Sequence, residues 1–148
     1  MVVLALPDAV GAVILQLRSF SELTALCGSG SPRISGAAQV SWSPMPRTAI
    51  LVAQVGGPGE WADVDRMNIR IRLKCYGATP LAAAALWRMA DACFCPSRAS
   101  GLSRGFTRAS CRVEDVANLT SPFSDVEPGT EWPVTLADYM IRHLKGPV

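Results

Sequence analysis

The stretch Arg66–Tyr76 (RMNIRIRLKCY) alternates apolar and polar residues over its whole length. Successive side chains of a β-strand point to opposite faces of the sheet, so this pattern predicts a strand with one core face and one surface face. Charge reversal on the surface face is expected to leave the fold intact, whereas an aspartate on the core face is expected to unfold it. The core face holds Met67, Ile69, Ile71, Leu73 and Cys75, and the surface face is basic, with Asn68, Arg70, Arg72 and Lys74.

A second strand is predicted upstream, over residues 48–55 (TAILVAQV). Both of its faces are apolar, which is typical of a strand inside a sheet rather than at its edge. The glycine-rich residues 56–65 join it to the first strand. The two strands are therefore expected to form a hairpin whose loop projects from the domain.

Two helices are predicted from their start signals. Thr79 and Pro80 suit the N-cap and first turn of a helix over residues 81–94. Near the N-terminus, Asp8 is expected in the first turn of a helix whose apolar residues recur with helical spacing. Within that helix, residues 19–22 (SFSE) resemble a capping box that restarts or kinks it.

The remaining segments complete a single domain over residues 1–148. Residues 108–116 and 133–144 are predicted strands, and residues 118–130 are predicted to be a long loop. The fold class is therefore α+β: a two-layer sandwich of about four mostly antiparallel strands, with two helices on one face and the projecting hairpin.

Composition excludes several classes of protein. Apolar residues make up 49% of the 148 residues and charged residues 18%, which is too apolar for an intrinsically disordered chain. The net charge of +2 excludes a generic polycation. No transmembrane helix or signal peptide is expected, and the five cysteines are expected to be free thiols in a reducing cytosol.

The sequence offers no combination of residues typical of catalysis or metal binding. The single histidine, His143, has no recognisable triad partners, and Cys93 and Cys95 form a C-x-C rather than a zinc-like C-x-x-C. The glycines of residues 56–59 lack the lysine and helix start of a phosphate loop. We therefore expect no enzyme activity, no cofactor, and no catalytic or metal-binding residue.

Two surface features qualify as candidate assembly contacts. The arginine-rich segment after the second helix is either a solvated loop or a contact for an acidic partner or a nucleic acid backbone. Aromatic residues in predicted loops are either interface anchors or plugs of the core. With the basic strand face, the candidate interface residues are Trp61, Arg70, Arg72, Lys74, Arg98, Arg104, Phe106 and Arg108.

The order of these segments resembles the tail terminator (tail completion) family of long-tailed bacteriophages. The resemblance covers nearly the whole chain, from residue 8 to residue 144, and depends on order and spacing rather than on one fingerprint. It is carried by residues 8–10 (DAV), 23–26 (LTAL), 33–34 (RI), 44–46 (PMP), 69–77 (IRIRLKCYG), 79–83 (TPLAA), 132–133 (WP) and 139–142 (YMIR).

This resemblance implies a structural virion protein without catalytic residues. The family forms a ring, usually a hexamer, that caps the tail tube, ends tail growth and joins the tail to the head. The implied partners are further copies of the chain, the tail tube protein and a head–tail connector or neck protein, with non-specific contact to DNA in the ring lumen also allowed and no membrane. The implied location is the tail–neck joint of the virion, after assembly in the host cytoplasm.

Two other interpretations remain open at this stage. A head–tail connector subunit would share the size and the assembly but would contact the portal side of the neck. A small α+β ligand-binding domain or enzyme would need a pocket with converging polar groups.

Overall fold

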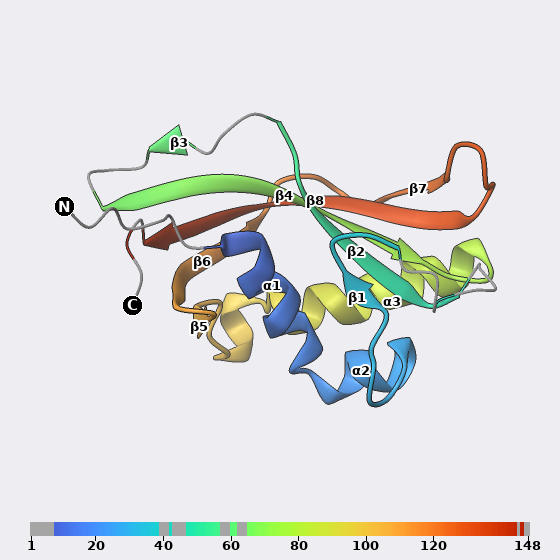
Figure 1. Ribbon diagram of the computed structural model, residues 1–148, viewed down its shortest axis with the longest axis horizontal. Helices are drawn as coiled ribbons and strands as arrows, with labels where there is room; N and C mark the ends of the chain where they lie inside the picture. Colours follow the sequence, from blue (N-terminus) through green and yellow to red (C-terminus); the bar gives the residue numbers. More distant parts are fainter. Residues whose placement is uncertain are drawn as a thin grey trace.

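Figure 1 shows a computed structural model of the chain, which describes residues 8–38, 42, 47–56, 60–61, 65–144 and 146. A β-sheet forms one layer, and three α-helices lie together on one side of it. The helices are α1 (Ala9–Arg18), α2 (Ser21–Cys27) and α3 (Pro80–Phe94), with a short 3-10 helix, η2 (Arg98–Ser100). The strands are β1 (Ile34–Ser35), β2 (Ala49–Gln54), β3 (Glu60–Trp61), β4 (Arg66–Tyr76), β5 (Phe106–Arg108), β6 (Cys111–Asn118), β7 (Phe123–Val126) and β8 (Pro133–Leu144).

The centre of the sheet is the antiparallel pair of its two longest strands, β4 and β8. Eleven residue pairs join them, from Arg66 opposite Leu144 to Tyr76 opposite Val134. All five residues of the predicted core face of β4 are buried, each at most 8% exposed, and Tyr76 is buried in addition, on the opposite face. The predicted strand over residues 133–144 is also confirmed at both ends.

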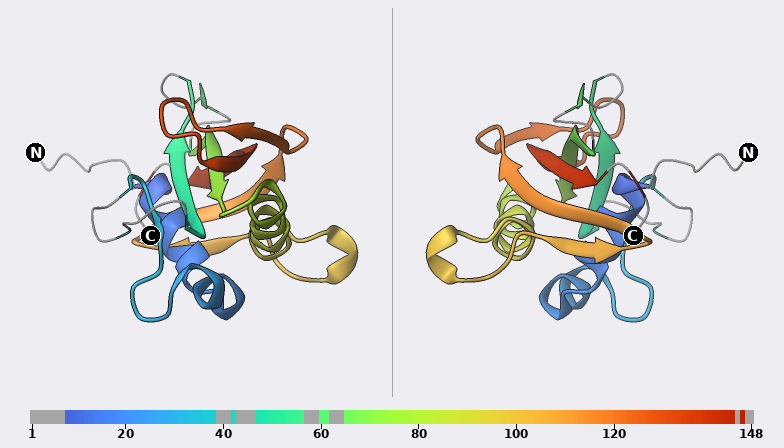
Figure 2. Two further views of the ribbon diagram at one scale, coloured as in Figure 1. Left: turned by 90° about the vertical axis from the view of Figure 1, so that its right-hand side faces the viewer. Right: turned by 90° about the vertical axis from the view of Figure 1, so that its left-hand side faces the viewer.

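The other strands extend this pair on both sides. The sheet order is β1-β2-β4-β8-β6-β5, with β3 paired to β4 and β7 paired to β8. All pairs are antiparallel except β1 with β2, which is parallel. Viewed along the long axis, the sheet curls toward the helices (Figure 2).

The α+β class is confirmed, but the sheet is curled rather than the flat layer of the predicted two-layer sandwich, and the predicted counts of elements are wrong. The described residues form an eight-stranded sheet rather than one of about four strands, and three α-helices rather than two. Residues 108–116 were expected to be one strand, yet a turn divides this region between β5 and β6. The expected loop over residues 118–130 contains β7. The sequence pattern missed these strands because they are short and partly solvent-facing, so neither shows regular alternation of apolar residues.

The predicted β2–β4 hairpin forms, and part of its connection returns to the sheet. Six residue pairs join the two strands, from Ala49 opposite Tyr76 to Gln54 opposite Ile71. Within the connection, β3 pairs with the start of β4. The rest of the expected projecting loop, residues 57–59 and 62–64, lies outside the described residues.

Helices α1 and α3 begin within two residues of the positions predicted from their N-terminal sequences. Thr79 Oγ1 accepts a hydrogen bond from the backbone nitrogen of Ala82 and caps α3. Asp8 is the N-cap of α1 rather than a residue of its first turn, because its carboxylate accepts from Gly11 N. The expected capping box is wrong: Phe20 precedes α2 and makes no side-chain cap.

The break between α1 and α2 is nevertheless real, with an angle of 86° between them. None of the described helices could cross a membrane by itself, and only this bent pair meets the length and composition required.

Most of the buried apolar residues among those described belong to two hydrophobic clusters. The larger one lies between the inner face of the sheet and the helices, and includes Leu17, Leu23, Ile71, Leu86 and Tyr139. The smaller one lies on the outer face at the β7–β8 turn end of the sheet. It contains Trp42, Ala49, Tyr76, Val134 and Leu136, with Leu51 and Trp132 packed beside them.

The connection from β4 to α3 passes through a glycine with no room for a side chain. A Cβ atom on Gly77 would lie 2.5 Å from the backbone nitrogen of Ala83 and 2.8 Å from the carbonyl carbon of Ala82. Backbone atoms of a helix cannot rotate away as a side-chain end can. The close approach of β4 to the first turn of α3 therefore requires glycine at this position.

We predict that Gly77→Ala lowers the free energy of unfolding by about 1–3 kcal/mol, because it overpacks this junction. Gly36→Ala is the matched control, since its Cβ would have no neighbour closer than 3.8 Å. The control is expected to stay within about 0.5 kcal/mol of the parent. Chemical denaturation of both variants measures the difference, and equal stabilities would contradict the proposed clash.

Candidate functional site

The basic face of β4 lies on the outer surface of the sheet, where acidic residues meet it. Arg66 pairs with Glu114 of β6. Lys74 Nζ lies 3.7 Å from Oε1 of Glu127, which also accepts a 2.9 Å hydrogen bond from the Tyr76 hydroxyl through Oε2. Arg70 and Arg72 share the remaining partner, Asp138.

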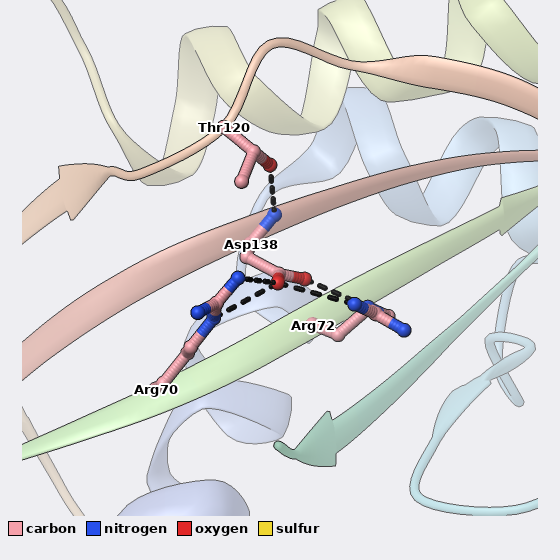
Figure 3. A network of polar contacts seen from close by, with 4 residues as sticks. All are labelled: Arg70, Arg72, Thr120 and Asp138. Atoms are coloured by element: carbon pink, nitrogen blue, oxygen red, sulfur yellow. Dashed lines mark hydrogen bonds and ion pairs between the residues drawn. The ribbon is translucent and has the colours of Figure 1, made fainter. Parts of the chain in front are cut away.

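Asp138 is the centre of this surface (Figure 3). Its Oδ2 accepts hydrogen bonds from Nη2 and Nε of Arg70, at 2.6 and 2.9 Å. Its Oδ1 accepts from Nε of Arg72 at 2.7 Å, and Arg72 Nη2 also reaches Oδ2 at 3.2 Å. The Asp138 side chain is only 1% exposed, whereas those of Arg70 and Arg72 are 45% and 33% exposed.

An insertion beside β8 helps to enclose Asp138. Strands β6 and β7 pair with the same edge of β8, from Asn118 opposite Tyr139 and from Phe123 opposite Leu136. Residues 119–122 bridge the gap between them and satisfy the Asp138 backbone. Leu119 N donates to the Asp138 carbonyl at 2.8 Å, and Asp138 N donates to Thr120 Oγ1 at 3.0 Å (Figure 3).

The protonation of Asp138 reflects these contacts. Burial by itself would raise the pKa of this carboxyl group, but hydrogen bonds from Arg72 and Arg70, together with their charges, bring it below its usual value. The carboxylate is therefore ionised near neutral pH. One negative charge shared by two guanidinium groups leaves this part of the sheet with less excess positive charge than the sequence predicts.

The basic surface face predicted for β4 is therefore neutralised in part by acidic residues of the same chain. Arg70, Arg72 and Lys74 are on the outer face as predicted, but each one meets a carboxylate of this chain. Reversing Arg72 would place a second carboxylate beside buried Asp138, so the expectation that such a change leaves the fold intact is withdrawn. The cause is non-local: Asp138 and Glu127 lie 53 to 68 positions further along the chain than their basic partners.

A cleft of about 770 Å³ lies elsewhere, between α3, η2, β6 and the insertion at 119–122. On its α3 side, the Tyr139 hydroxyl donates to Asp91 Oδ1 at 2.7 Å and accepts from Trp87 Nε1 at 3.1 Å. Burial and the Asp91 contact raise the pKa of Tyr139, so this hydroxyl remains protonated. The lining includes Trp87, Asp91, Cys95, Arg104, Asn118 and Pro122.

Arg104 lines this cleft and stabilises β6 through a hydrogen bond to its backbone. Strand β5 covers β6 only as far as Val113. Beyond that point, Arg104 Nη1 donates to the carbonyl of Val116 at 3.2 Å, and Arg104 Nε donates to the carbonyl of Pro96 at 2.8 Å. The Cys95 thiol also donates to Val116 O, at 3.5 Å, and burial raises its pKa, which disfavours the nucleophilic thiolate.

The structure places the other candidate residues in different environments. Phe106 is 8% exposed and its ring lies 6.4 Å from that of Phe94, so it is a core residue rather than a surface anchor. Arg108 is exposed and donates to Gln16 Oε1 at 3.0 Å. Trp61 is part of β3 and Arg98 part of η2, but their side chains lie outside the described residues.

Sequence reasoning missed Asp138, the centre of the outer-face network. A signal was present, because Asp138 is the one acidic residue inside the otherwise largely apolar strand over residues 133–144. Its meaning depends on the β4–β8 register, which sets Asp138 directly opposite Arg72. Among the described residues, no group of three histidine, cysteine or acidic side chains is arranged to hold a metal ion.

We predict that Asp138→Asn lowers the free energy of unfolding by about 2–3 kcal/mol near pH 7, because two arginines lose their buried counter-charge. The depressed folded-state pKa stabilises the fold above the unfolded-state pKa of about 4, and this contribution is lost as the pH falls through the folded-state pKa. The difference between the parent and the variant should therefore shrink below about pH 4. Denaturation at several pH values measures it, with exposed Asp125→Asn as the control.

Comparison with known proteins gives a structural match and no sequence match. No family model matches the chain, and no curated protein does. The fold is similar to that of a chain in a solved structure described as "Virion of native gene transfer agent (GTA) particle", with a TM-score of 0.64. The similarity covers 93% of this chain and 98% of that chain, at 15% sequence identity. At this level of identity, the finding establishes a shared fold.

Proposed function

We propose that this chain is a structural subunit of a phage-like virion, and specifically a tail terminator. In this role, copies of the chain form a ring of six that caps the tail tube, ends tail growth and joins the tail to the head. The observation that carries the proposal is the fold shared with a gene transfer agent virion chain over 93% of one chain and 98% of the other. Coverage of this extent in both directions means that whole domains correspond, not a common fragment.

The surface of the domain supports a role in assembly. Leu81 on α3 is 78% exposed and Leu102 beyond η2 is 66% exposed, in a chain with only 18% charged residues. Helix α3 also turns Ala82, Ala85 and Met89 to the surface. Contiguous exposed apolar surface is typical of contact sites, and the exposed face of α3 is a candidate for one.

The cleft supports a structural role better than a catalytic one. A ligand-binding domain or enzyme needs polar groups that converge on the space a ligand would occupy. Here the Tyr139 hydroxyl, Asp91 and the Trp87 indole bind one another, while Arg104 binds two backbone carbonyls. These bonds fix α3 and the segment after it against the sheet. We therefore propose a role without substrate turnover.

The proposal includes partners and a location. The ring would contact further copies of the chain, the end of the tail tube and a connector protein on the neck side. It would lie at the tail–neck joint of the virion after assembly in the host cytoplasm. The candidate interface residues that remain at least partly exposed with described side chains are Arg70, Arg72, Lys74, Arg104 and Arg108.

We predict that purified protein binds the ends of tail tubes from the same particle as a closed ring, with a mass near six times 15.7 kDa. Electron microscopy of the tubes shows where it binds, and native mass spectrometry counts the copies. Heads that carry portal and neck proteins but no tail serve as the comparison.

The outcomes of this comparison distinguish a tail terminator, a head–tail connector subunit and a protein without a virion role. Rings on tube ends support the tail terminator, whereas binding to heads alone would favour a head–tail connector subunit. Protein that ignores both particles at every salt concentration would contradict a virion role.

A further inference from the structure

Charge is segregated along the second half of the chain. Residues 92–113 contain four arginines and no acidic residue, whereas residues 114–141 contain six acidic residues and neither lysine nor arginine. On the outer face of the sheet, several of these acidic residues pair with β4. Of the described charges in these two segments that have no ion pair, Arg108 and Arg112 lie on one hairpin and Asp125 and Glu131 on another, while Arg104 and Asp115 lie outside these sets.

The first is the basic hairpin, formed by β5, the turn at 109–110 and the start of β6. Arg108 is exposed and Arg112 is half-buried. Their contacts are with neutral acceptors, since Arg108 donates to Gln16 Oε1 at 3.0 Å and Arg112 to Thr107 Oγ1 at 3.4 Å. Within the described part of the chain, neither guanidinium group meets a carboxylate.

The second is the acidic hairpin, formed by β7, the turn at 127–132 and the start of β8. Asp125 and Glu131 are both exposed, and no basic side chain of the described residues pairs with either. Asp125 Oδ1 accepts only from the neighbouring Val126 N, at 2.8 Å. Phe123 and Val126, on the same strand, are 45% and 48% exposed, so this surface combines apolar contact area with negative charge.

The two hairpins lie toward opposite ends of the long axis, as Figure 1 shows from the positions of β5 and of the β7–β8 turn. They also share a backbone feature. Among the described residues, every non-glycine with positive φ belongs to them: Ala109 at 49°, Ser110 at 57° and Glu131 at 58°. Such conformations cost free energy and cluster at functional surfaces.

We propose that the acidic hairpin of one copy docks on the edge of the basic hairpin of a second copy, so that Asp125 and Glu131 meet Arg108 on the helix side of that hairpin and Arg112 on its outer face. This inference rests on the proposed ring and names the contact that would build it. The side chain of Leu15, 44% exposed beside Gln16 on α1, is available to meet Phe123 or Val126. Because the two surfaces differ, the contact is head-to-tail, and repetition of it closes a ring if the rotation permits.

Charge-swapped variants test this contact. One variant carries Asp125→Lys and Glu131→Lys, so both of its hairpins are basic; the other carries Arg108→Glu and Arg112→Glu, so both are acidic. Each variant should fold, because surface substitutions of this kind cost little stability. If the second fails to fold by circular dichroism, Arg108→Glu alone replaces it.

We expect each variant alone to need at least a tenfold higher concentration for half-maximal assembly than the parent, because like charges face each other. An equimolar mixture should recover assembly to within about threefold of the parent and give rings with equal numbers of the two variants. The parent should also assemble less well in 0.5 M salt than in 0.05 M salt. Native mass spectrometry and sedimentation measure all three results, with Glu22→Lys, a charge reversal at an exposed position of α2, as the control.

The outcomes show separately whether the hairpin contact is wrong and whether the proposed ring is wrong. If the parent forms rings and both variants form them equally well, the hairpin contact is wrong and the ring stands. If each variant is impaired but the mixture fails to recover, the pairing of these two surfaces is wrong. If the parent forms no ring, either in solution or on tube ends, both the contact and the proposed function are overturned.

Discussion

The antiparallel pairing of β4 with β8 is the constraint on which the rest of the structure depends. Its eleven residue pairs set both faces of the sheet at once. On the inner face, residues such as Ile71 and Tyr139 form the floor on which the helices pack. On the outer face, the same register brings Asp138 opposite Arg72. A slip by one residue would exchange the two faces and bury the arginines in the core.

The outer face illustrates how a buried charge limits what a surface can do. Asp138 is 1% exposed, and a carboxylate so placed is tolerated only with strong partners. Two arginines fill this need, and the insertion at 119–122 satisfies the backbone beside it. The arginines are thereby held in place by the fold. They are less available for a partner than a row of basic residues in the sequence suggests.

The basic side chains in the middle of the outer sheet face form ion pairs with acidic residues of the chain. Arg108 and Asp125, which form no ion pair among the described residues, lie toward the two ends of the sheet. A domain with unlike charged ends and exposed apolar residues is suited to repeat head to tail. The cleft beside α3 has a different character, because its polar groups hold the fold together. These features agree with the proposed role of a virion ring subunit, in which binding surfaces matter and reactive groups do not.

Local sequence by itself determined β4, β8 and α3, because alternation and capping act between residues close in the chain. It also determined that the chain breaks between α1 and α2. The roles of Asp138, Arg104 and Phe106 were decided only by tertiary structure. Asp138 meets Arg72 across 66 positions of the chain, and Phe106 is buried because its ring packs on Phe94. Strand β7 exists because β8 offers it an edge, which no pattern within four residues can reveal.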